Sequence, residues 1–450
     1  MGTSRVRGGY FLKKMKETGS LRAEGAILVG VGKSAEREAL GPLVELRRLV
    51  ETAGAHVLES VWQSREKLDA TYCIGSGKVE EVRVLADRLK ANVVIIDHDL
   101  TPAQVRNLEE ILDRKVLDRS EVILDIFASH ARSTQAKLQV ELAQLRYQLP
   151  RLKHLWTHLE RLGGGIGTRG PGEKQLETDR RLASQRIQEL QRRLDEIKRR
   201  RERQVSDRTG YFSVGLVGYT NAGKSTLLNA LTNADAYVAD KLFATLDTKT
   251  RLWHLAPRME ALVSDTVGFI RKIPTHLIES FNATLAEARH ADLLLHVIDV
   301  SSPAAMAEAQ TVDGVLQQIE CAEKPTIAIL NKMDRLEDQT ALALLRNRYP
   351  REVEVSALRG DGLEQLTGTV IEILRERMIT ARVTVEQSAS RTFAELKRAA
   401  EVLESRAGES RVELVVRIRP DVLAQLAGSL EGLRVIEPAG FAAKSPRAEE

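Results

Sequence analysis

The sequence predicts an α/β protein with two parallel-sheet domains, a long helical hairpin between them and a small α+β domain at the C-terminal end. In residues 24–133, and again in residues 208–380, short apolar runs alternate with stretches of helical period, which is typical of parallel strands covered by helices. Residues 134–207 instead carry regularly spaced leucines and a basic stretch, which favours helices alone. Residues 1–23 lack periodicity, so we expect a loose tail there.

The composition excludes several classes of protein. The 450 residues suffice for about three domains, and 43% hydrophobic with 29% charged residues is a globular composition. Apolar runs stay well short of the roughly 20 residues of a membrane span, and residues 1–16 lack the apolar core of a signal peptide. We therefore expect no stable membrane insertion, while peripheral membrane association stays open. The net charge of +4 is small, so a nucleic-acid surface would need local clustering of basic residues.

The two cysteines bear on the cellular setting. Cys73 and Cys321 lie far apart in the sequence and match no metal or disulfide pattern. A reducing, cytoplasmic location is the simple inference.

Residues 24–133 contain strand and helix patterns in alternation. Gly54 is a good residue to end the first helix, and Thr101 followed by Pro102 is a good start for the third. The last apolar run ends in Asp97, which is typical of a buried parallel strand. The expected strands are 26–30, 55–60 and 93–97, and the expected helices are 40–53, 79–90 and one that starts at 101.

Two short stretches of this domain have alternative interpretations. Residues 74–78 (I-G-S-G-K) lie between a strand and a helix, where such a turn can hold a phosphate or serve only as a turn. They lack the full spacing of a phosphate loop, so the structural turn is favoured. His98 and Asp99 follow the last strand, and helix capping is favoured there over ligand binding.

Residues 134–207 predict two helices that fold back as an antiparallel hairpin, with a glycine-rich tip at 163–172. Pro150 would kink or restart the first helix, and the second would run from about 173 to 204. The leucines of the first helical stripe are Leu138, Leu142, Leu145, Leu149, Leu152, Leu155, Leu159 and Leu162.

The second helix is strongly basic over residues 180–203, where Leu190, Leu194 and Ile197 recur among the arginines. One face can therefore pack while the other presents arginine to phosphates. A solvated face that binds nothing is the alternative. The candidate RNA contacts are Arg169 in the glycine-rich tip and Arg192, Arg193, Arg199, Arg200 and Arg201 in the helix.

Residues 218–225 (G-Y-T-N-A-G-K-S) fit the phosphate-loop pattern G-x-x-x-x-G-K-[ST] without a mismatch. An apolar run at 214–217 precedes them and a helical pattern begins at 226, so backbone N–H groups and a helix N-terminus would face an anion. A turn that binds nothing is the alternative. Lys224 would contact the β- and γ-phosphates, and Ser225 would hold Mg²⁺. The expected phosphate contacts are Gly218, Tyr219, Thr220, Asn221, Ala222, Gly223, Lys224 and Ser225.

Two later stretches match the switch segments of nucleotide hydrolases. In residues 243–247 (F-A-T-L-D), Thr245 would close over Mg²⁺. Residues 262–268 predict a strand that ends in D-x-x-G, where Asp265 would hold a Mg²⁺-bound water and the Gly268 amide would face the γ-phosphate. Lys224, Thr245, Asp265 and Gly268 are thus the catalytic candidates. The expected nucleotide contacts here are Phe243, Ala244, Thr245, Leu246, Asp247, Asp265, Thr266, Val267 and Gly268.

Residues 331–334 (N-K-M-D) follow a buried strand and fit the guanine-reading pattern N-K-x-D. The Asp334 carboxylate can accept hydrogen bonds from guanine N1–H and N2–H₂, which adenine does not present together. Residues 356–358 (S-A-L) would offer a backbone amide to guanine O6. In this order the motifs predict a Ras-like P-loop GTPase domain that hydrolyses GTP with Mg²⁺. The expected base contacts are Asn331, Lys332, Met333, Asp334, Ser356, Ala357 and Leu358.

Two residues bear on the hydrolysis step. Phe269 follows Gly268, where Ras-like GTPases place the glutamine that orients the attacking water. We therefore expect slow hydrolysis in isolation, another catalytic group, or a partner. Asn221 lies where some small GTPases bind K⁺, an ion that would add positive charge to the transition state. Simple hydrogen bonding within the loop is the alternative for Asn221.

Taken with these motifs, residues 25–370 resemble the HflX family of translational GTPases. The resemblance rests on residues 163–173 (G-G-G-I-G-T-R-G-P-G-E), residues 176–181 (L-E-T-D-R-R) and residues 243–247, and Phe269 also follows the family's pattern. Thr248 stands where the family often has proline. The resemblance implies an N-terminal HflX domain, a helical hairpin and a GTPase domain in that order.

The resemblance also implies a function. Its members bind the large ribosomal subunit and its RNA, and in the GTP form split stalled or idle 70S ribosomes, with the hairpin near the peptidyl-transferase region. Ribosome-stimulated hydrolysis would then release the factor. Two alternatives remain: a GTP-dependent assembly factor for the large subunit, and a regulatory switch that binds a protein effector. We expect a ribosome-associated monomer that binds GTP and GDP.

Residues 381–450 predict the small α+β appendage. Residues 393–404 and 421–430 have helical patterns, and residues 412–419 alternate as a strand. We expect residues 442–450 to be disordered.

Overall fold

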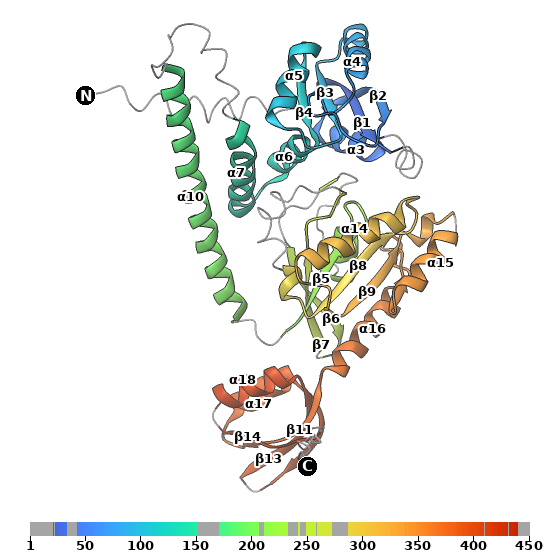
Figure 1. Cartoon of the computed structure of the whole chain (residues 1–450). Helices are drawn as coiled ribbons and strands as arrows, with labels where there is room; N and C mark the ends of the chain where they lie inside the picture. The colour runs from blue at the N-terminus through green and yellow to red at the C-terminus, as the bar shows by residue number, and fades with distance from the viewer. Residues whose placement is uncertain are drawn as a thin grey trace, which may run out of the picture.

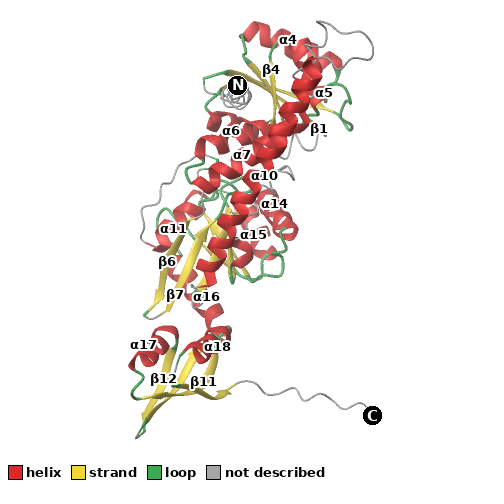
Figure 2. Ribbon diagram, turned by 90° about the vertical axis from the view of Figure 1, so that its left-hand side faces the viewer, coloured by secondary structure: helices red, strands yellow, loops and turns green. Residues whose placement is uncertain are grey.

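The computed structural model describes residues 21, 23–33, 43–151, 171–206, 211–232, 242–243, 249–257, 259–271, 287–337, 339–408, 410–430 and 432–439. Two α/β domains pack against one another, a pair of helices runs beside them, and a smaller domain lies at the end remote from the N-terminal domain (Figures 1 and 2). Among the described helices, none combines the length and the apolar character needed to cross a membrane.

The N-terminal domain is a four-stranded parallel sheet in the order β2-β1-β3-β4. The expected strands and helices within residues 43–112 are confirmed, and Gly54 and Thr101 form the expected caps. Leu21, which we expected in a loose tail, is instead buried. The elements are β1 (Gly25–Gly32), α3 (Val44–Ala53), β2 (His56–Ser64), α4 (Ser76–Leu89), β3 (Val93–Ile96), α5 (Pro102–Leu112), β4 (Lys115–Asp118) and α6 (Arg119–His130).

Two helices follow the N-terminal domain, as expected for a hairpin. Helix α7 (Thr134–Gln148) ends at the 3₁₀ turn η1 (Leu149–Arg151), so the regular α-helix is interrupted at Pro150. Helix α10 (Pro171–Ser206) packs on α7 through a cluster that includes Leu142 and Leu190. The glycine-rich tip up to residue 170, with Arg169 and the leucines from Leu152 to Leu162, lies outside the described residues.

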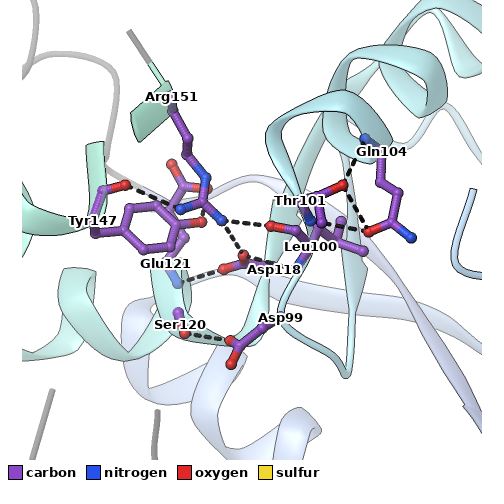
Figure 3. Close-up of polar contacts among 9 residues, drawn as sticks. All are labelled: Asp99, Leu100, Thr101, Gln104, Asp118, Ser120, Glu121, Tyr147 and Arg151. Carbon is purple, nitrogen blue, oxygen red and sulfur yellow. Dashed lines mark hydrogen bonds and ion pairs between the residues drawn. The ribbon is translucent and has the colours of Figure 1, made fainter. Parts of the chain in front are cut away.

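A buried polar cluster fixes the turn η1 to the N-terminal domain (Figure 3). The Arg151 guanidinium donates to the Leu100 carbonyl at 2.7 Å and to the Asp118 carboxylate at 3.0 Å, and it lies 3.5 Å from the centre of the Tyr147 ring. The Tyr147 hydroxyl approaches the Glu121 carboxylate at 3.4 Å. Burial, followed by the charge of Asp118, raises the pKa of Glu121 to about 7.

The nucleotide domain has a six-stranded sheet in the order β10-β9-β8-β5-β7-β6. All its strands are parallel except the edge strand β6, which pairs antiparallel with β7. Helices pack on this sheet: α11 contacts β5, β6 and β7, and α14 contacts β5 and β8. The elements are β5 (Phe212–Gly218), α11 (Lys224–Thr232), β6 (Lys249–Ala256), β7 (Met259–Asp265), β8 (Leu293–Asp299), α14 (Ala305–Gln318), β9 (Thr326–Asn331), η2 (Met333–Arg335), α15 (Gln339–Arg348), β10 (Glu352–Glu354) and α16 (Leu363–Glu376).

The two α/β domains share one continuous hydrophobic cluster. It includes Leu46 and Val122 from the N-terminal domain and Tyr219 from the phosphate loop. Within this cluster Phe127 of α6 packs on Phe243 in an edge-to-face contact, with ring centres 4.7 Å apart. The hydrophobic core therefore positions the N-terminal domain beside the nucleotide site.

The C-terminal domain confirms the predicted α+β class. Its antiparallel sheet has the order β12-β13-β11-β14, with α17 and α18 packed on one face (Figures 1 and 2). One prediction was wrong: residues 401–404 belong to a strand, not to the helix expected over 393–404. The elements are β11 (Ile379–Glu386), α17 (Ser390–Ala399), β12 (Glu401–Ala407), β13 (Arg411–Ile418), α18 (Pro420–Ser429) and β14 (Leu433–Ala439).

The raised pKa of Glu121 predicts a pH-dependent stability. A carboxyl whose pKa is higher in the folded than in the unfolded state favours folding at low pH, and this contribution is lost as pH rises from about 4.5 through about 7. Glu121→Gln should therefore stabilise the chain at pH 8 relative to the unmodified protein, with a much smaller gain at pH 5. Denaturant unfolding at both pH values measures this difference. The exposed Glu110→Gln serves as control, and an equal gain at both pH values would contradict the assignment.

Candidate functional site

The phosphate loop joins β5 to α11 at the carboxyl end of the sheet. Gly223 has a φ of 98°, and a Cβ at this position would lie 2.2 Å from the Asn331 amide nitrogen. The loop therefore needs glycine both for its backbone angle and for the close approach of a loop that precedes η2. The predicted strand, turn and helix N-terminus are confirmed.

The Lys224 side chain is buried beneath this loop. Its ammonium donates to the carbonyls of Gly218 at 3.1 Å and Tyr219 at 2.8 Å, and it is 6% exposed. Burial lowers the pKa of Lys224 to about 8, and the charge of Asp265 partly opposes this. A phosphate beside the ammonium would favour its charged form, so the site suits an anionic ligand.

Ser225 and Asp265 bring hard oxygen donors together at the start of α11. The Ser225 hydroxyl donates to the Asp265 carboxylate at 2.6 Å, and Asp265 is fully buried at the end of β7. A hydroxyl and a carboxylate are ligands that suit Mg²⁺, so these residues fit the expected ion. Thr245, the third expected member, lies outside the described residues, as do Ala244, Leu246 and Asp247.

The segment after β7 lies directly on the phosphate loop. The Thr220 N–H donates to the Phe269 carbonyl at 2.7 Å, and the Phe269 N–H donates to the Gly218 carbonyl at 3.1 Å. A Cβ on Gly268 would lie 2.7 Å from the Thr220 Cα, so this position also requires glycine. Phe269 is 2% exposed and hence cannot orient a water molecule through its side chain.

Asn331 connects the loops on the base side of the site. Its amide group donates to the Ala222 carbonyl at 2.8 Å, and its carbonyl accepts from the Ala357 N–H at 3.0 Å. The side chain is 2% exposed, so breaking either bond would leave a buried polar group unsatisfied. One amide thus holds the phosphate loop beside the turn that follows β10.

Asp334 and Lys332 are positioned by bonds from neighbouring loops. The Ser356 hydroxyl donates to the Asp334 carboxylate at 2.6 Å, and this bond lowers the pKa of Asp334. The Lys332 ammonium donates to the Asp299 carboxylate at 2.7 Å. Leu358 is 79% exposed and extends away from the core. Asp334 is therefore an oriented, ionised acceptor, which is the form that guanine recognition requires.

The structure brings most of the expected nucleotide residues to one edge of the sheet. Phosphate-loop, switch and base-side residues meet through the contacts above, and Phe243 joins them because its N–H donates to the Thr220 hydroxyl at 2.9 Å. Thr266 is also fixed, through a 2.6 Å bond from its hydroxyl to the Leu216 carbonyl. The positions lining this edge are residues 218–225, 243, 265–268, 331–334 and 356–358.

The expected RNA contacts lie apart from this site on α10. Arg192 and Arg193 are exposed and have acidic neighbours one turn away, with Arg193 2.5 Å from the Glu189 carboxylate. Arg199 is exposed, and Arg200 and Arg201 belong to the same helix. The helix therefore offers basic side chains to solvent while its apolar residues pack on α7.

Sequence reasoning did not identify the contacts between the N-terminal domain and the switch segments. Arg119 of α6 donates to the Arg271 carbonyl at 3.0 Å, and the Arg271 N–H donates to the Tyr219 hydroxyl at 2.9 Å. No motif marks these residues, since an arginine in a helix is usually a solvated side chain.

Comparisons with known proteins identify families and relatives that this chain is similar to. Three family profiles match the chain: "GTP-binding GTPase N-terminal" over residues 41–128, "GTP-binding GTPase Middle Region" over 130–208, and "50S ribosome-binding GTPase" over 213–332.

Several relatives carry the name GTPase HflX. One from Magnetococcus marinus is 42% identical over 93% of this chain and 97% of its own length. One from Lacrimispora saccharolytica is 47% identical over 79% and 84%, and one from Escherichia coli K12 is 45% identical over 78% and 83%. Among solved structures, a GTP-binding protein from Sulfolobus solfataricus in complex with GDP is 26% identical, covers 78% of this chain and 99% of its own, and has a TM-score of 0.40.

The geometry of Asp334 predicts a change of base preference. Asp334→Asn should lower GTP affinity by about 100-fold, because the N1–H and N2–H₂ of guanine lose a charged acceptor pair. Affinity for xanthosine triphosphate should rise, since its 2-carbonyl can accept from the new amide. Competition between the two nucleotides measures this shift. The exposed Glu337→Gln in the same loop is the control, and an unchanged GTP preference would contradict the assignment.

Proposed function

This chain belongs to the HflX family of GTPases, and we propose that it binds the large ribosomal subunit and, in its GTP form, splits stalled or idle 70S ribosomes. The observation that carries the proposal is the match of residues 213–332 to a family of 50S ribosome-binding GTPases, in a chain whose HflX relatives span up to 93% of its length. The reaction is hydrolysis of GTP to GDP and phosphate. The protein would act as a ribosome-associated monomer.

The nucleotide residues would have distinct roles, and the role of Thr245, which lies outside the described residues, rests on the sequence motif alone. Lys224 would neutralise phosphate charge, the Gly268 amide would face the γ-phosphate, and Asp334 would bind the guanine edge. Ser225, Asp265 and Thr245 would hold Mg²⁺, directly or through water. When bound, the ion would neutralise charge on the β- and γ-phosphates.

The local charge of α10 supports an RNA partner. Residues 180–203 contain ten Arg or Lys residues against four Asp or Glu residues, whereas the whole chain has a net charge of only +4. Such clustering suits contact with a phosphate backbone. The hairpin would approach ribosomal RNA near the peptidyl-transferase region, with Arg169 at its tip.

The buried Phe269 supports a partner-dependent reaction. Its side chain cannot orient the attacking water, so the ribosome would stimulate hydrolysis and thereby release the factor. In this cycle GTP favours the ribosome-bound conformation and GDP favours the free one.

Co-sedimentation tests the proposal. The chain is mixed with intact ribosomes or isolated subunits, in the presence of a non-hydrolysable GTP analogue or GDP. We expect analogue-dependent binding to the large subunit and loss of intact 70S particles. Binding without loss of 70S particles would favour an assembly factor, and absence of binding in both nucleotide states would favour a switch for a protein effector.

Charge reversal on α10 should weaken ribosome binding while leaving nucleotide affinity unchanged. Replacing Arg199, Arg200 and Arg201 with Glu should make the plot of log affinity against log salt shallower by about 2 to 3 units, because phosphate contacts release counterions. The matched control replaces three basic residues of the N-terminal domain, Arg88, Lys90 and Arg106, with Glu. Unchanged ribosome binding in the α10 variant would contradict an RNA-binding role of that face. An equal loss of ribosome binding in both variants would indicate an effect of net charge alone.

We also propose that Asn221 holds K⁺. Replacing K⁺ by Na⁺ at constant ionic strength should then slow hydrolysis by about tenfold, because a fixed positive charge stabilises the transition state. Asn221→Ala should remove this dependence on the cation. Single-turnover hydrolysis in the two salts measures the effect, and equal rates for the unmodified protein would exclude the ion site.

A further inference from the structure

Two adjacent residues, Asp118 and Arg119, connect the helical hairpin with the nucleotide site. Strand β4 ends at Asp118, and helix α6 begins at Arg119. The Asp118 carboxylate accepts from Arg151, the last residue of η1, while the Arg119 guanidinium donates to the Arg271 carbonyl beside the nucleotide site. The junction between β4 and α6 therefore contacts both the hairpin and the switch segment.

Asp118 fixes the last residue of the turn η1 to the N-terminal domain (Figure 3). It is fully buried, accepts from the Leu100 N–H at 3.2 Å, and caps α6 by accepting from the Glu121 N–H at 2.9 Å. Because Asp118 is the N-cap of α6, its carboxylate moves with that helix. Arg151 must follow, since its guanidinium is paired with this carboxylate.

Arg119 fixes the opposite side of the junction. Its side chain is 4% exposed, and it pairs with Asp97 at 2.7 Å and Glu45 at 2.5 Å. The Arg271 carbonyl completes this set, and Arg271 itself is bound to the Tyr219 hydroxyl of the phosphate loop. A cation this deeply buried is expensive to separate from its partners. A displacement of Arg271 is therefore passed to α6 instead of being absorbed by solvent.

A second contact on the same helix reinforces this connection. Phe127, two turns along α6, packs edge-to-face on Phe243. Phe243 is bound in turn to Thr220 of the phosphate loop. Helix α6 thus contacts both segments that flank the expected γ-phosphate position.

We propose that the Asp118–Arg119 junction transmits the nucleotide state of residues 265–271 to Arg151, and hence to the turn η1 at the end of the first hairpin helix. Asp118 and Arg119 are positioning residues: they do not contact the nucleotide, but set where the hairpin stands in each nucleotide state. The inference rests on the proposed function in one respect: the movement of the hairpin would serve nucleotide-dependent binding to the ribosome. The quantity to be measured is the energetic coupling between the nucleotide site and Arg151.

Amide hydrogen exchange of the full chain, without ribosomes, provides that test. Exchange is compared between saturating GTP analogue and saturating GDP in residues 119–130 and residues 145–151. In the unmodified chain we expect a nucleotide-dependent change of about threefold or more in both segments. Arg119→Lys removes the forked donor and should abolish the response in both. Arg151→Lys should abolish it in residues 145–151 and preserve it in residues 119–130.

The control is Arg114→Lys. Arg114 also joins a backbone carbonyl and a carboxylate, those of Ala91 and Asp87, but within the N-terminal domain alone. This variant should retain the full response in both segments. A merely structural role of Arg119 would raise exchange in both nucleotide states without removing the difference between them.

Thermal unfolding shows whether each variant is folded. If Arg119→Lys does not fold, Asp97→Asn takes its place, because it keeps an acceptor for Arg119 while removing one charge, and it should reduce the response in both segments. The proposal is overturned if residues 145–151 respond equally with and without Arg119, or if neither segment of the unmodified chain responds. Neither result bears on ribosome binding, which co-sedimentation tests separately.

Discussion

The pairing of the buried Arg119 guanidinium is the interaction on which the arrangement of the two α/β domains depends. Removing a charge from water costs several kcal/mol, so a buried cation persists only where acceptors surround it. Glu45 and Asp97 supply the opposite charges, and they outweigh burial to raise the pKa of Arg119. The nucleotide domain supplies a further acceptor, the Arg271 carbonyl. Separating the domains would remove that acceptor and expose the apolar cluster around Phe127 and Phe243. Both the hydrogen bond and the apolar burial therefore favour the packed arrangement of the two domains.

In both domains, polar loops and aspartate side chains cluster at the carboxyl ends of the parallel strands, where α/β folds usually bind ligands. In the nucleotide domain this edge carries the phosphate loop and Asp265. In the N-terminal domain it carries Asp97, Asp99 and Asp118, and their partners come from the chain itself: Arg119, Ser120 and Arg151. Polar groups of the turn at 74–78 also have partners within the chain. Lys78 pairs with Glu81 at 2.6 Å, and the Gly75 N–H donates to the Gln63 side chain. These contacts favour a structural turn there over a second phosphate site.

The sequence predicted those features that short-range chemistry determines. A phosphate loop needs glycine where Gly223 has a positive φ, and base recognition needs an acceptor like Asp334, so motif and geometry agree at both positions. Strands such as β3 were visible because a fully buried strand is uniformly apolar. Strand β12 was mistaken for helix because it is a polar, exposed edge strand whose pairing with β13 leaves no local pattern. The Arg119 cluster was invisible for a different reason, since its partners lie 22, 74 and 152 residues away.

The setting of Phe269 explains why an external activator suits this site. Its side chain is buried, and its backbone exchanges two hydrogen bonds with the phosphate loop, so any rearrangement of this segment must break them. Under the proposed function, the free energy of ribosome binding would offset the cost of breaking these hydrogen bonds. Binding free energies are reciprocal, so a ribosome that is bound better by the GTP form must raise GTP affinity by the same factor. Arg271, two residues beyond Phe269, carries the Arg119 contact, and the same rearrangement would therefore disturb the docking of the N-terminal domain. A single rearrangement of the segment that contains Phe269 and Arg271 would then both permit hydrolysis and change the position of the hairpin.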